Sequence, residues 1–373
     1  MERQFPQPAG VTSKTAQTDN SPEEANARAG QAASLEQDYS RLITGAALAD
    51  FPNLSILQAY GPDTSSFLQG MVTNDVAKLQ PGEGCLAALL NPIGKVISDL
   101  IALKLHEERF WIIIRQDRRE KVDQSLKRFI VSDDVETGAL EDWSALGVLG
   151  PQSRERLGAV FPRLPEKSLA SLEFQIDGDA VRVLRHLRLG IDGYHLWVPA
   201  ARHDHWSGLI KAKCGLESVP DRVLEVIRIE AGVPEYGIDF DESNIPLESN
   251  LDDLLDFQKG CYTGQEIVSR VTYLGNVSRK LVGLLANDVR IPEKGEEIRL
   301  GDQAIGRITS AAWSPALKQP IALGYVQRKF LEYGKEVELA SGIKASISQL
   351  PLVTVESRRS KVESRGRNQS RDL

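Results

Sequence analysis

The segment with the clearest chemical potential surrounds Cys261, which follows Lys259 by two positions. Thr263 and Glu266 have the T-x-x-E spacing of a capping box, so we predict a helix that begins near Gly264. Cys261 would then lie just before a helix N-terminus, where unpaired backbone N–H groups and the Lys259 ammonium favour the thiolate form. We therefore predict Cys261 as the reactive, catalytic residue, with Lys259 assisting it. The alternative is a buried structural cysteine beside a capping loop.

The sequence lacks convincing motifs for binding nucleotides or metals. Gly82–Ala87 matches G-x-G-x-x-A, but a strand is predicted after it, whereas the dinucleotide fingerprint needs a helix there. The Gly94-Lys95 pair is followed by Val96 instead of Ser or Thr, which argues against a P-loop. The three cysteines form no C-x-x-C pair. We therefore expect no bound metal and no disulfide framework, which fits a reducing compartment.

Composition narrows the classes of partner. The chain of 373 residues carries 45 basic and 52 acidic side chains, a formal net charge of −7. A surface that binds DNA or RNA needs a surplus of Lys and Arg, so nucleic acid is not an expected partner. The apolar run Phe110–Ile114 is far shorter than the ~20 residues of a membrane helix. The first residues lack the features of a secretory or mitochondrial targeting peptide, and we expect a cytoplasmic protein.

The two ends of the chain differ from its middle. Residues 1–40 are rich in Ala, Gln, Asn, Ser and Glu and poor in large apolar side chains, so we predict a disordered tail. Residues 357–373 carry a surplus of basic side chains, and we predict a second disordered tail that aids solubility, with a contact to a polyanion as the alternative. The folded part between the tails is long enough for two or three domains.

Three compositional blocks divide this folded part. In residues 41–142, apolar runs bounded by turn residues indicate strands at 54–60, 85–90, 95–105 and 110–114. Residues 143–278 repeat this mixture of strands and helices and contain the Cys261 segment. Residues 279–356 show short strands separated by Gly and Pro, which is typical of a small barrel or sandwich. We predict an α+β fold with two antiparallel-sheet domains and a C-terminal β-barrel-like domain.

Four motifs together carry a resemblance to a known family. Lys259–Glu266, K-G-C-Y-T-G-Q-E, resembles the signature of the YgfZ family of folate-binding proteins, which are relatives of the glycine-cleavage T-protein, an aminomethyltransferase. Phe67–Val76, Asn91–Asp99 and Arg228–Gly237 support the resemblance and occur in the expected order. It implies a three-domain ring around a tetrahydrofolate-binding channel. It also implies a role in iron–sulfur cluster assembly or repair, and through it in methylthiolation of tRNA.

Departures from the T-protein pattern bear on the choice between these relatives. In this resemblance, aminomethyltransferases have an Asp-Asp pair at the position where this chain has Ser98-Asp99. They also tend to carry Glu where this chain has His195. A lost carboxylate alters proton transfer near the folate nitrogen, and His is a poorer acceptor for the pterin N–H donors. The Lys-Gly-Cys motif has no T-protein counterpart. Folate-dependent aminomethyl transfer is therefore the alternative function, and a scaffold that binds a protein partner without folate is a third.

The resemblance also suggests which residues line the folate channel. Arg228 and Lys259 would supply cations for the folate carboxylates, and Asp99 and Tyr236 would hold the pterin end. Cys261 would face the same channel. Arg228 could instead be a surface or paired helix residue, and Asp99 a strand-edge charge in water. The expected partners are folate and iron–sulfur enzymes or their assembly factors.

Overall fold

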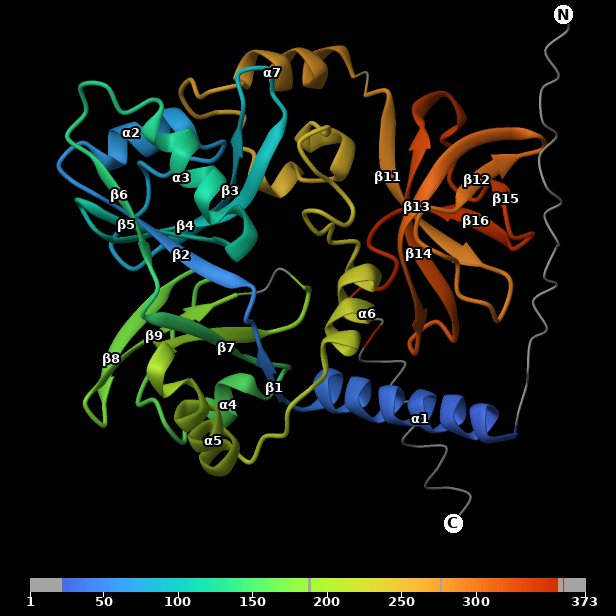
Figure 1. Cartoon of the computed structure of the whole chain (residues 1–373), viewed down its shortest axis with the longest axis horizontal. Helices are drawn as coiled ribbons and strands as arrows, with labels where there is room; N and C mark the ends of the chain where they lie inside the picture. Colours follow the sequence, from blue (N-terminus) through green and yellow to red (C-terminus); the bar gives the residue numbers. More distant parts are fainter. Residues whose placement is uncertain (1–21, 187–188, 276, 355–357, 359–373) are drawn as a thin grey trace, which may run out of the picture.

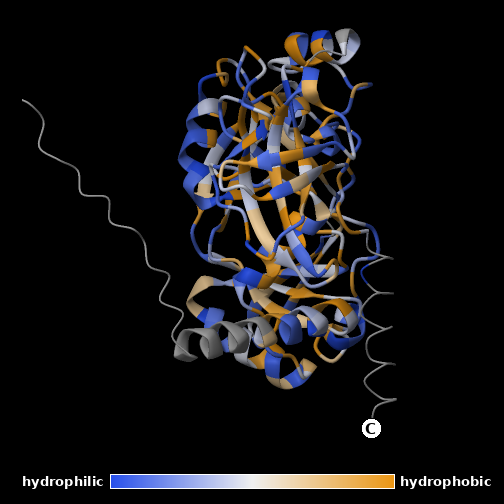
Figure 2. Ribbon diagram, turned by 90° about the vertical axis from the view of Figure 1, so that its right-hand side faces the viewer, coloured by the Kyte–Doolittle hydropathy of each residue, from blue (hydrophilic) through white to orange (hydrophobic). Residues whose placement is uncertain are grey.

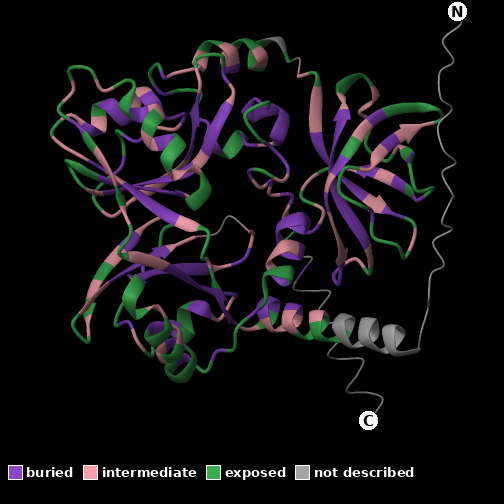
Figure 3. Cartoon of the chain, in the orientation of Figure 1, coloured by how far each residue is buried: buried purple, intermediate pink, exposed green. Residues whose placement is uncertain are grey.

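The computed structural model describes residues 22–186, 189–275, 277–354 and Arg358. Two five-stranded antiparallel sheets and a closed six-stranded barrel form three lobes (Figure 1). This arrangement confirms the predicted fold class of two α+β domains and a C-terminal barrel. Buried residues concentrate on the strands and on helix α6, as Figure 3 shows, and apolar segments run along the strands in Figure 2.

The first sheet has the strand order β3-β4-β5-β2-β6 and carries helices α2 and α3. Its elements are β2 (Leu54–Tyr60), α2 (Thr64–Met71), β3 (Gly84–Leu90), β4 (Val96–His106), β5 (Arg109–Arg115), a 3₁₀ turn (Gln116–Arg118), α3 (Arg119–Lys127) and β6 (Glu136–Leu140). Phe67 and Leu68 of α2 and Val122 and Leu126 of α3 are buried against the strands. The predicted helical and strand periodicities therefore correspond to one shared core.

The second sheet has the order β1-β7-β10-β9-β8. Its elements are β1 (Ala47–Asp50), β7 (Trp143–Leu149), α4 (Ser153–Leu157), β8 (Ser171–Ile176), β9 (Asp179–Arg185), β10 (Gly193–Pro199), a 3₁₀ turn (Ala200–Arg202) and α5 (His203–Cys214). Strand β1 precedes the whole first sheet in the chain but pairs antiparallel with β7. The predicted boundary at residues 142 and 143 therefore does not separate the two sheets cleanly.

Part of the region between the second sheet and the barrel packs against the first sheet, although we predicted it as part of the second domain. It contains α6 (Asp221–Ala231), 3₁₀ turns (Pro246–Ser249 and Asp252–Leu254) and α7 (Gln265–Leu274). Its apolar side chains from Tyr236 to Val268 share a core with Ala88, Leu90 and Val96 of the first sheet. The predicted second domain, 143–278, is thus divided between both sheets, because burial follows these contacts and not the order of the chain.

The barrel closes in the order β11-β14-β13-β12-β15-β16. Its elements are β11 (Arg279–Ala286), β12 (Glu297–Leu300), β13 (Gln303–Ser314), β14 (Gln319–Gln327), a 3₁₀ turn (Arg328–Phe330), β15 (Glu336–Leu339) and β16 (Lys344–Ser348). Closure pairs both edges of the sheet, so no strand edge of this lobe is left open. The barrel contacts α6 through β13 and β14.

The prediction of a disordered tail over residues 1–40 is wrong for its second half. Helix α1 spans Pro22–Thr44 and lies beside α6 (Figure 1). Tyr39 is buried, and its hydroxyl donates to the carboxylate of Glu230 on α6 at 2.8 Å. Residues 1–21 lie outside the described residues. So does the predicted basic tail, except for Arg358, which is buried and forms an ion pair with Glu230 at 3.0 Å.

Among the described residues, no helix is long and apolar enough to cross a membrane.

Candidate functional site

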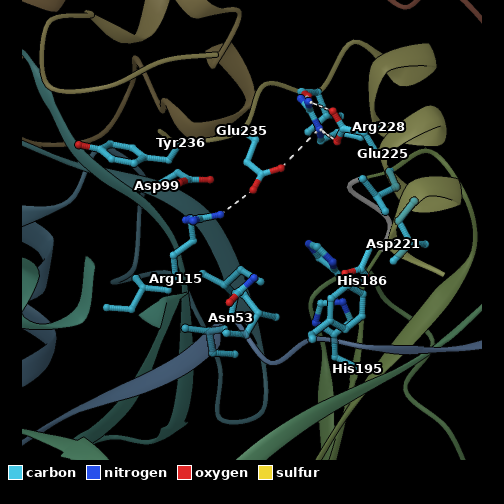
Figure 4. A pocket seen from close by; sticks show the side chains of 18 of the residues that line it. Asn53, Asp99, Arg115, His186, His195, Asp221, Glu225, Arg228, Glu235 and Tyr236 are labelled. Atoms are coloured by element: carbon cyan, nitrogen blue, oxygen red, sulfur yellow. Dashed lines mark hydrogen bonds and ion pairs between the residues drawn. The ribbon is translucent and has the colours of Figure 1, made fainter. Parts of the chain in front are cut away.

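A pocket of about 450 Å³ lies where the two sheets meet α6 (Figure 4). Its size falls within the range of small-molecule sites. The walls come from the β1–β2 connection, from β4 and β5, from the β9–β10 region, and from α6 with the loop that follows it. In residue numbers these are 50–54, 99–101, 113–115, 186, 189, 195, 221, 222, 224, 225, 228 and 233–236.

The structure brings Asp99, Arg228 and Tyr236 to this one pocket, although they are far apart in the sequence. Asp99 is half-buried on β4 and faces the pocket beside Tyr236 in Figure 4. The Tyr236 ring lies against the guanidinium of Arg118 at 4.4 Å. Burial raises the pKa of Tyr236 to about 12, so its phenol is neutral at physiological pH and can donate a hydrogen bond.

Ser98 does not face the pocket, which changes the argument drawn from the missing second carboxylate. Successive residues of a strand point to opposite faces of the sheet, and only Asp99 of this pair lines the pocket. Ser98 is fully buried, and its hydroxyl donates to the carbonyl oxygen of Asp99 at 2.8 Å. The side chain at position 98 therefore says nothing about proton transfer inside the pocket.

Arg228 is held by the protein's own carboxylates. Its guanidinium contacts both oxygens of Glu225, at 2.6 and 2.7 Å, and the buried carboxylate of Asp239 at 2.5 Å. Burial works against its charge, but the hydrogen bond to Glu225 and the neighbouring carboxylates outweigh burial and raise the pKa of Arg228. Arg228 is thus the paired helix residue that we considered as an alternative, and it also forms part of the pocket wall.

Glu235 is a pocket residue that the sequence reasoning missed. Its carboxylate points into the space between Arg115 and Arg228 (Figure 4) and accepts a hydrogen bond from Arg115 at 2.5 Å. The other carboxylate oxygen lies 3.5 Å from Nε of Arg228. Only its position next to Tyr236 could have identified Glu235 from the sequence. A single Glu in a loop belongs to no helical or strand pattern.

His195 forms part of the opposite wall. Its ring packs between Phe51 and His186, with a centroid separation of 4.7 Å to each. The side chain is buried, and among the described residues its Nδ1 atom has no hydrogen-bond partner. Burial lowers the pKa of His195 to about 4, so the ring is neutral at physiological pH. A buried polar atom without a partner indicates a position that a ligand or a water molecule would satisfy.

Lys259 does not line this pocket. Its ammonium is buried and donates to the carbonyl oxygens of Gln69, Val72 and Asn74 at 2.6, 2.6 and 3.1 Å. These carbonyls lie at and just beyond the C-terminal end of α2, where helix carbonyls lack partners within the helix. Burial lowers the pKa of Lys259 to about 8. Because its hydrogen bonds are made to the protein, Lys259 holds the 256–263 loop against the first sheet, away from the pocket.

Cys261 is exposed and lies outside the pocket lining, so it is not the buried structural cysteine of the alternative interpretation. The predicted helix start is confirmed, since α7 begins at Gln265 with Gly264 as its N-cap. The capping box is not formed, because no side chain caps α7. Gly264 has a φ of +84°, and a Cβ atom there would lie 2.7 Å from the carbonyl oxygen of Asn91. The reactivity of Cys261 stays a prediction.

Comparison with known proteins points to one family. Residues 3–259 match the model of the GCVT N-terminal domain, and residues 279–353 match that of the glycine cleavage T-protein C-terminal barrel domain. An aminomethyltransferase of Thermoanaerobacter sp. (strain X514) is 27% identical over 317 residues, which cover 82% of this chain and 85% of the relative. One of Symbiobacterium thermophilum is 28% identical over 344 residues, with 86% and 90% covered.

The fold has a close counterpart among solved structures. The crystal structure of the glycine cleavage system aminomethyltransferase T from Bartonella henselae superposes with a TM-score of 0.79 at 24% identity, and covers 86% of this chain and 89% of that one. The resemblance to the YgfZ family is wrong by these findings, because the matched models and relatives are those of aminomethyltransferases. The iron–sulfur role and the tRNA modification that it implied are overturned with it. The Lys259–Glu266 motif misled the interpretation, because Lys259 serves the packing of α2 and the motif does not reach the pocket.

Proposed function

The chain belongs to the glycine cleavage T-protein family, and on that basis we propose that it is a tetrahydrofolate-dependent aminomethyltransferase whose folate site is the pocket between the two sheets and α6. Folate-dependent aminomethyl transfer was the alternative function that we considered from the sequence. The observation that supports it most is that Asp99, Arg228 and Tyr236, from three separate segments, line one pocket. Family membership also supports the predicted tetrahydrofolate cofactor.

The residues present suit this cofactor. A pterin ring is flat and rich in N–H donors, and the pocket offers carboxylates at Asp99 and Glu235 together with apolar walls from Leu100, Ile101 and Ile113. The unpartnered Nδ1 atom of His195 is a further buried polar group that a bound molecule could satisfy. Arg228 is occupied by Glu225 and Asp239.

The carboxylates of the folate tail need a different cation. Arg222 lines the pocket at the exposed start of α6, so the tail can meet it there without being buried. The pterin would then lie on the side of Asp99 and Tyr236, deeper between the sheets.

The pocket residues would divide the work of aminomethyl transfer. Tetrahydrofolate would supply the nucleophilic nitrogens that accept the one-carbon unit, with ammonia and a free carrier thiol as the other products. The two nitrogens lose one proton each in the transfer, and Asp99 would take up one of them on its carboxylate and return it to a leaving group, so that the amine and the carrier thiol each gain one. The phenol of Tyr236 would orient the bound ring by a hydrogen bond. Leu100, Ile101 and Ile113 would exclude water, which strengthens the polar interactions beside them.

Binding and turnover test the proposal separately. Isothermal titration calorimetry should show one tetrahydrofolate bound per chain. With an S-aminomethyl dihydrolipoyl carrier protein as donor, the protein should release ammonia and form methylene-tetrahydrofolate. Asp99→Asn should reduce the rate by about 100-fold or more, the usual size of a general acid–base contribution, while Asp302→Asn at an exposed turn of the barrel should not. Absence of tetrahydrofolate binding at millimolar concentration would refute the proposal.

Nothing in the relatives supports iron–sulfur proteins as partners. The cytoplasmic location expected from the sequence stays a prediction, as does the absence of a nucleic-acid partner.

A further inference from the structure

The group of charges around Arg115 and Arg228 contains more carboxylates than it needs for neutrality. Arg115 is paired with both oxygens of Asp117 at 3.1 Å. Arg228 is paired with Glu225 and Asp239. Each guanidinium therefore has a carboxylate partner before Glu235 is considered. Glu235 brings a further negative charge into the pocket, between the two arginines.

Both the backbone and the carboxylate of Glu235 are held in place. The backbone N–H of Glu235 donates to the Asp239 carboxylate at 2.9 Å, and the backbone N–H of Asp239 donates to the carbonyl oxygen of Glu235 at 2.8 Å. Arg115 and Arg228 hold one carboxylate oxygen each, from two different lobes of the molecule. Burial raises the pKa of Glu235, and Arg228 and Arg115 act against that change and favour its ionised form.

This carboxylate still has capacity to accept hydrogen bonds. An ionised carboxylate offers about four lone-pair positions, and the contacts with Arg115 and Arg228 occupy one on each oxygen. The two remaining positions lie on adjacent oxygens, which suits a ligand with two neighbouring N–H donors in one plane. On the opposite wall, His195 is buried with its Nδ1 atom unpartnered among the described residues, which independently indicates a position that a ligand or a water molecule would satisfy.

We infer that Glu235 determines specificity in this pocket by accepting two hydrogen bonds from the 2-aminopyrimidin-4-one edge of a planar ligand. The inference rests on the proposed function, in which that edge belongs to the pterin of tetrahydrofolate. Glu235, in the loop after α6, would supply the carboxylate that accepts from the pterin donors. On β10, the position of the expected Glu is occupied by His195. An anionic group is disfavoured at this end of the pocket, because Glu235 and Asp99 would repel it.

Calorimetric titration with two ligands tests the inference. Tetrahydrofolate has both N–H donors, and its 2-desamino-2-methyl analogue lacks the 2-amino group. The wild-type protein should bind tetrahydrofolate at least about 10-fold more tightly than the analogue. Glu235→Gln should weaken tetrahydrofolate binding by about 10- to 100-fold and the analogue by much less. Glu297→Gln removes a Glu–Arg pair of the barrel, between Glu297 and Arg299, far from the pocket lining, and should leave both affinities unchanged.

The other outcomes separate this inference from the proposed function. Equal binding of tetrahydrofolate by the wild type and Glu235→Gln would overturn the inference alone. Equal loss of both ligands would also overturn it, because it would show that Glu235 only joins two lobes. A wild-type protein that does not distinguish the two ligands refutes it without any variant, so poor folding of Glu235→Gln leaves a decisive measurement. No binding of tetrahydrofolate by the wild type would overturn both proposals.

Discussion

Replacement of His195 by Phe should make the protein less sensitive to acid. Burial lowers the pKa of His195 to about 4, whereas the unfolded chain has the ordinary value near 6.5. Between these values the unfolded state binds a proton that the folded state does not, so wild-type stability is lost as the pH falls from 6.5 through about 4. At about 1.4 kcal/mol for each pKa unit, the full effect is ~3 kcal/mol, of which ~2 kcal/mol develops between pH 7 and 4.5.

Urea unfolding of both proteins at pH 7 and at pH 4.5 measures this effect. Carboxylates titrate in the same range, but they are common to both proteins and cancel in the comparison. The free energy of unfolding of the wild type relative to His195→Phe should fall by ~2 kcal/mol between the two pH values. His205→Gln, a change of an exposed histidine on α5, should follow the wild type. If His195→Phe also follows the wild type to within ~0.5 kcal/mol, the argument from burial is refuted.

Three further predictions concern the Lys259–Cys261 loop. Lys259→Met should lower the free energy of unfolding in urea by about 3 kcal/mol, because it leaves buried carbonyls at the end of α2 without their donor; a change below 1 kcal/mol would contradict this. Cys261→Ser should leave both the urea midpoint and tetrahydrofolate affinity unchanged, since Cys261 is exposed and outside the pocket lining; a loss of affinity above 3-fold would contradict this. Iodoacetamide mapped by mass spectrometry should label Cys261 first, because Cys214 is buried and burial raises the pKa of Cys85 to about 12; earlier labelling of either would contradict this.

The position of Arg228 shows why a simple alanine substitution is a poor test of folate binding. Removal of its guanidinium would leave the Asp239 carboxylate, which has no exposed surface, without its ion pair. A buried carboxylate that loses its partner costs about 3–5 kcal/mol of stability. Lost binding in Arg228→Ala would therefore report on folding as much as on ligand contact. Glu235→Gln and Asp99→Asn change charge with little change in shape, and are better probes.

The sequence was informative where one property repeats along the chain. Apolar runs bounded by turn residues indicated the strands of the first sheet, and short strands between Gly and Pro indicated the barrel. The spacing of Thr263 and Glu266 indicated the start of α7, although the capping box itself is not formed. Helix α1 escaped notice because its polar composition suggests a disordered segment, whereas Tyr39, Leu42 and Ile43 are buried by α6 and neighbouring segments. No local pattern announces such partners, because they lie far along the chain.

The site was predictable in part, from the family resemblance and not from a repeated pattern. Asp99, Arg228 and Tyr236 stood in segments that resemble known relatives, and they meet in the pocket. Lys259 was assigned to the wrong surroundings, because the carbonyls that bind it belong to residues 69–74. The missing carboxylate at Ser98 was interpreted as a change in proton transfer at the folate site. This interpretation does not hold, because Ser98 is buried and faces away from the pocket. Position along one strand or helix could be reasoned out, whereas contacts between distant segments could not.

The pairing of β1 with β7 has a consequence for synthesis of the protein on the ribosome. At ordinary elongation rates, β1 leaves the ribosome on the order of ten seconds before β7 exists to pair with it. During that interval the nascent chain carries an unpaired strand, which is a site for association with other chains or for chaperones. Helix α6 is fully packed later still, because the buried carboxylate of Glu230 gains Ser314 and Arg358 only when the barrel and the residues that follow it have been synthesised. The pocket wall that α6 provides therefore gains these contacts only after the barrel has been synthesised, although the pocket lining itself lies within residues 50–236.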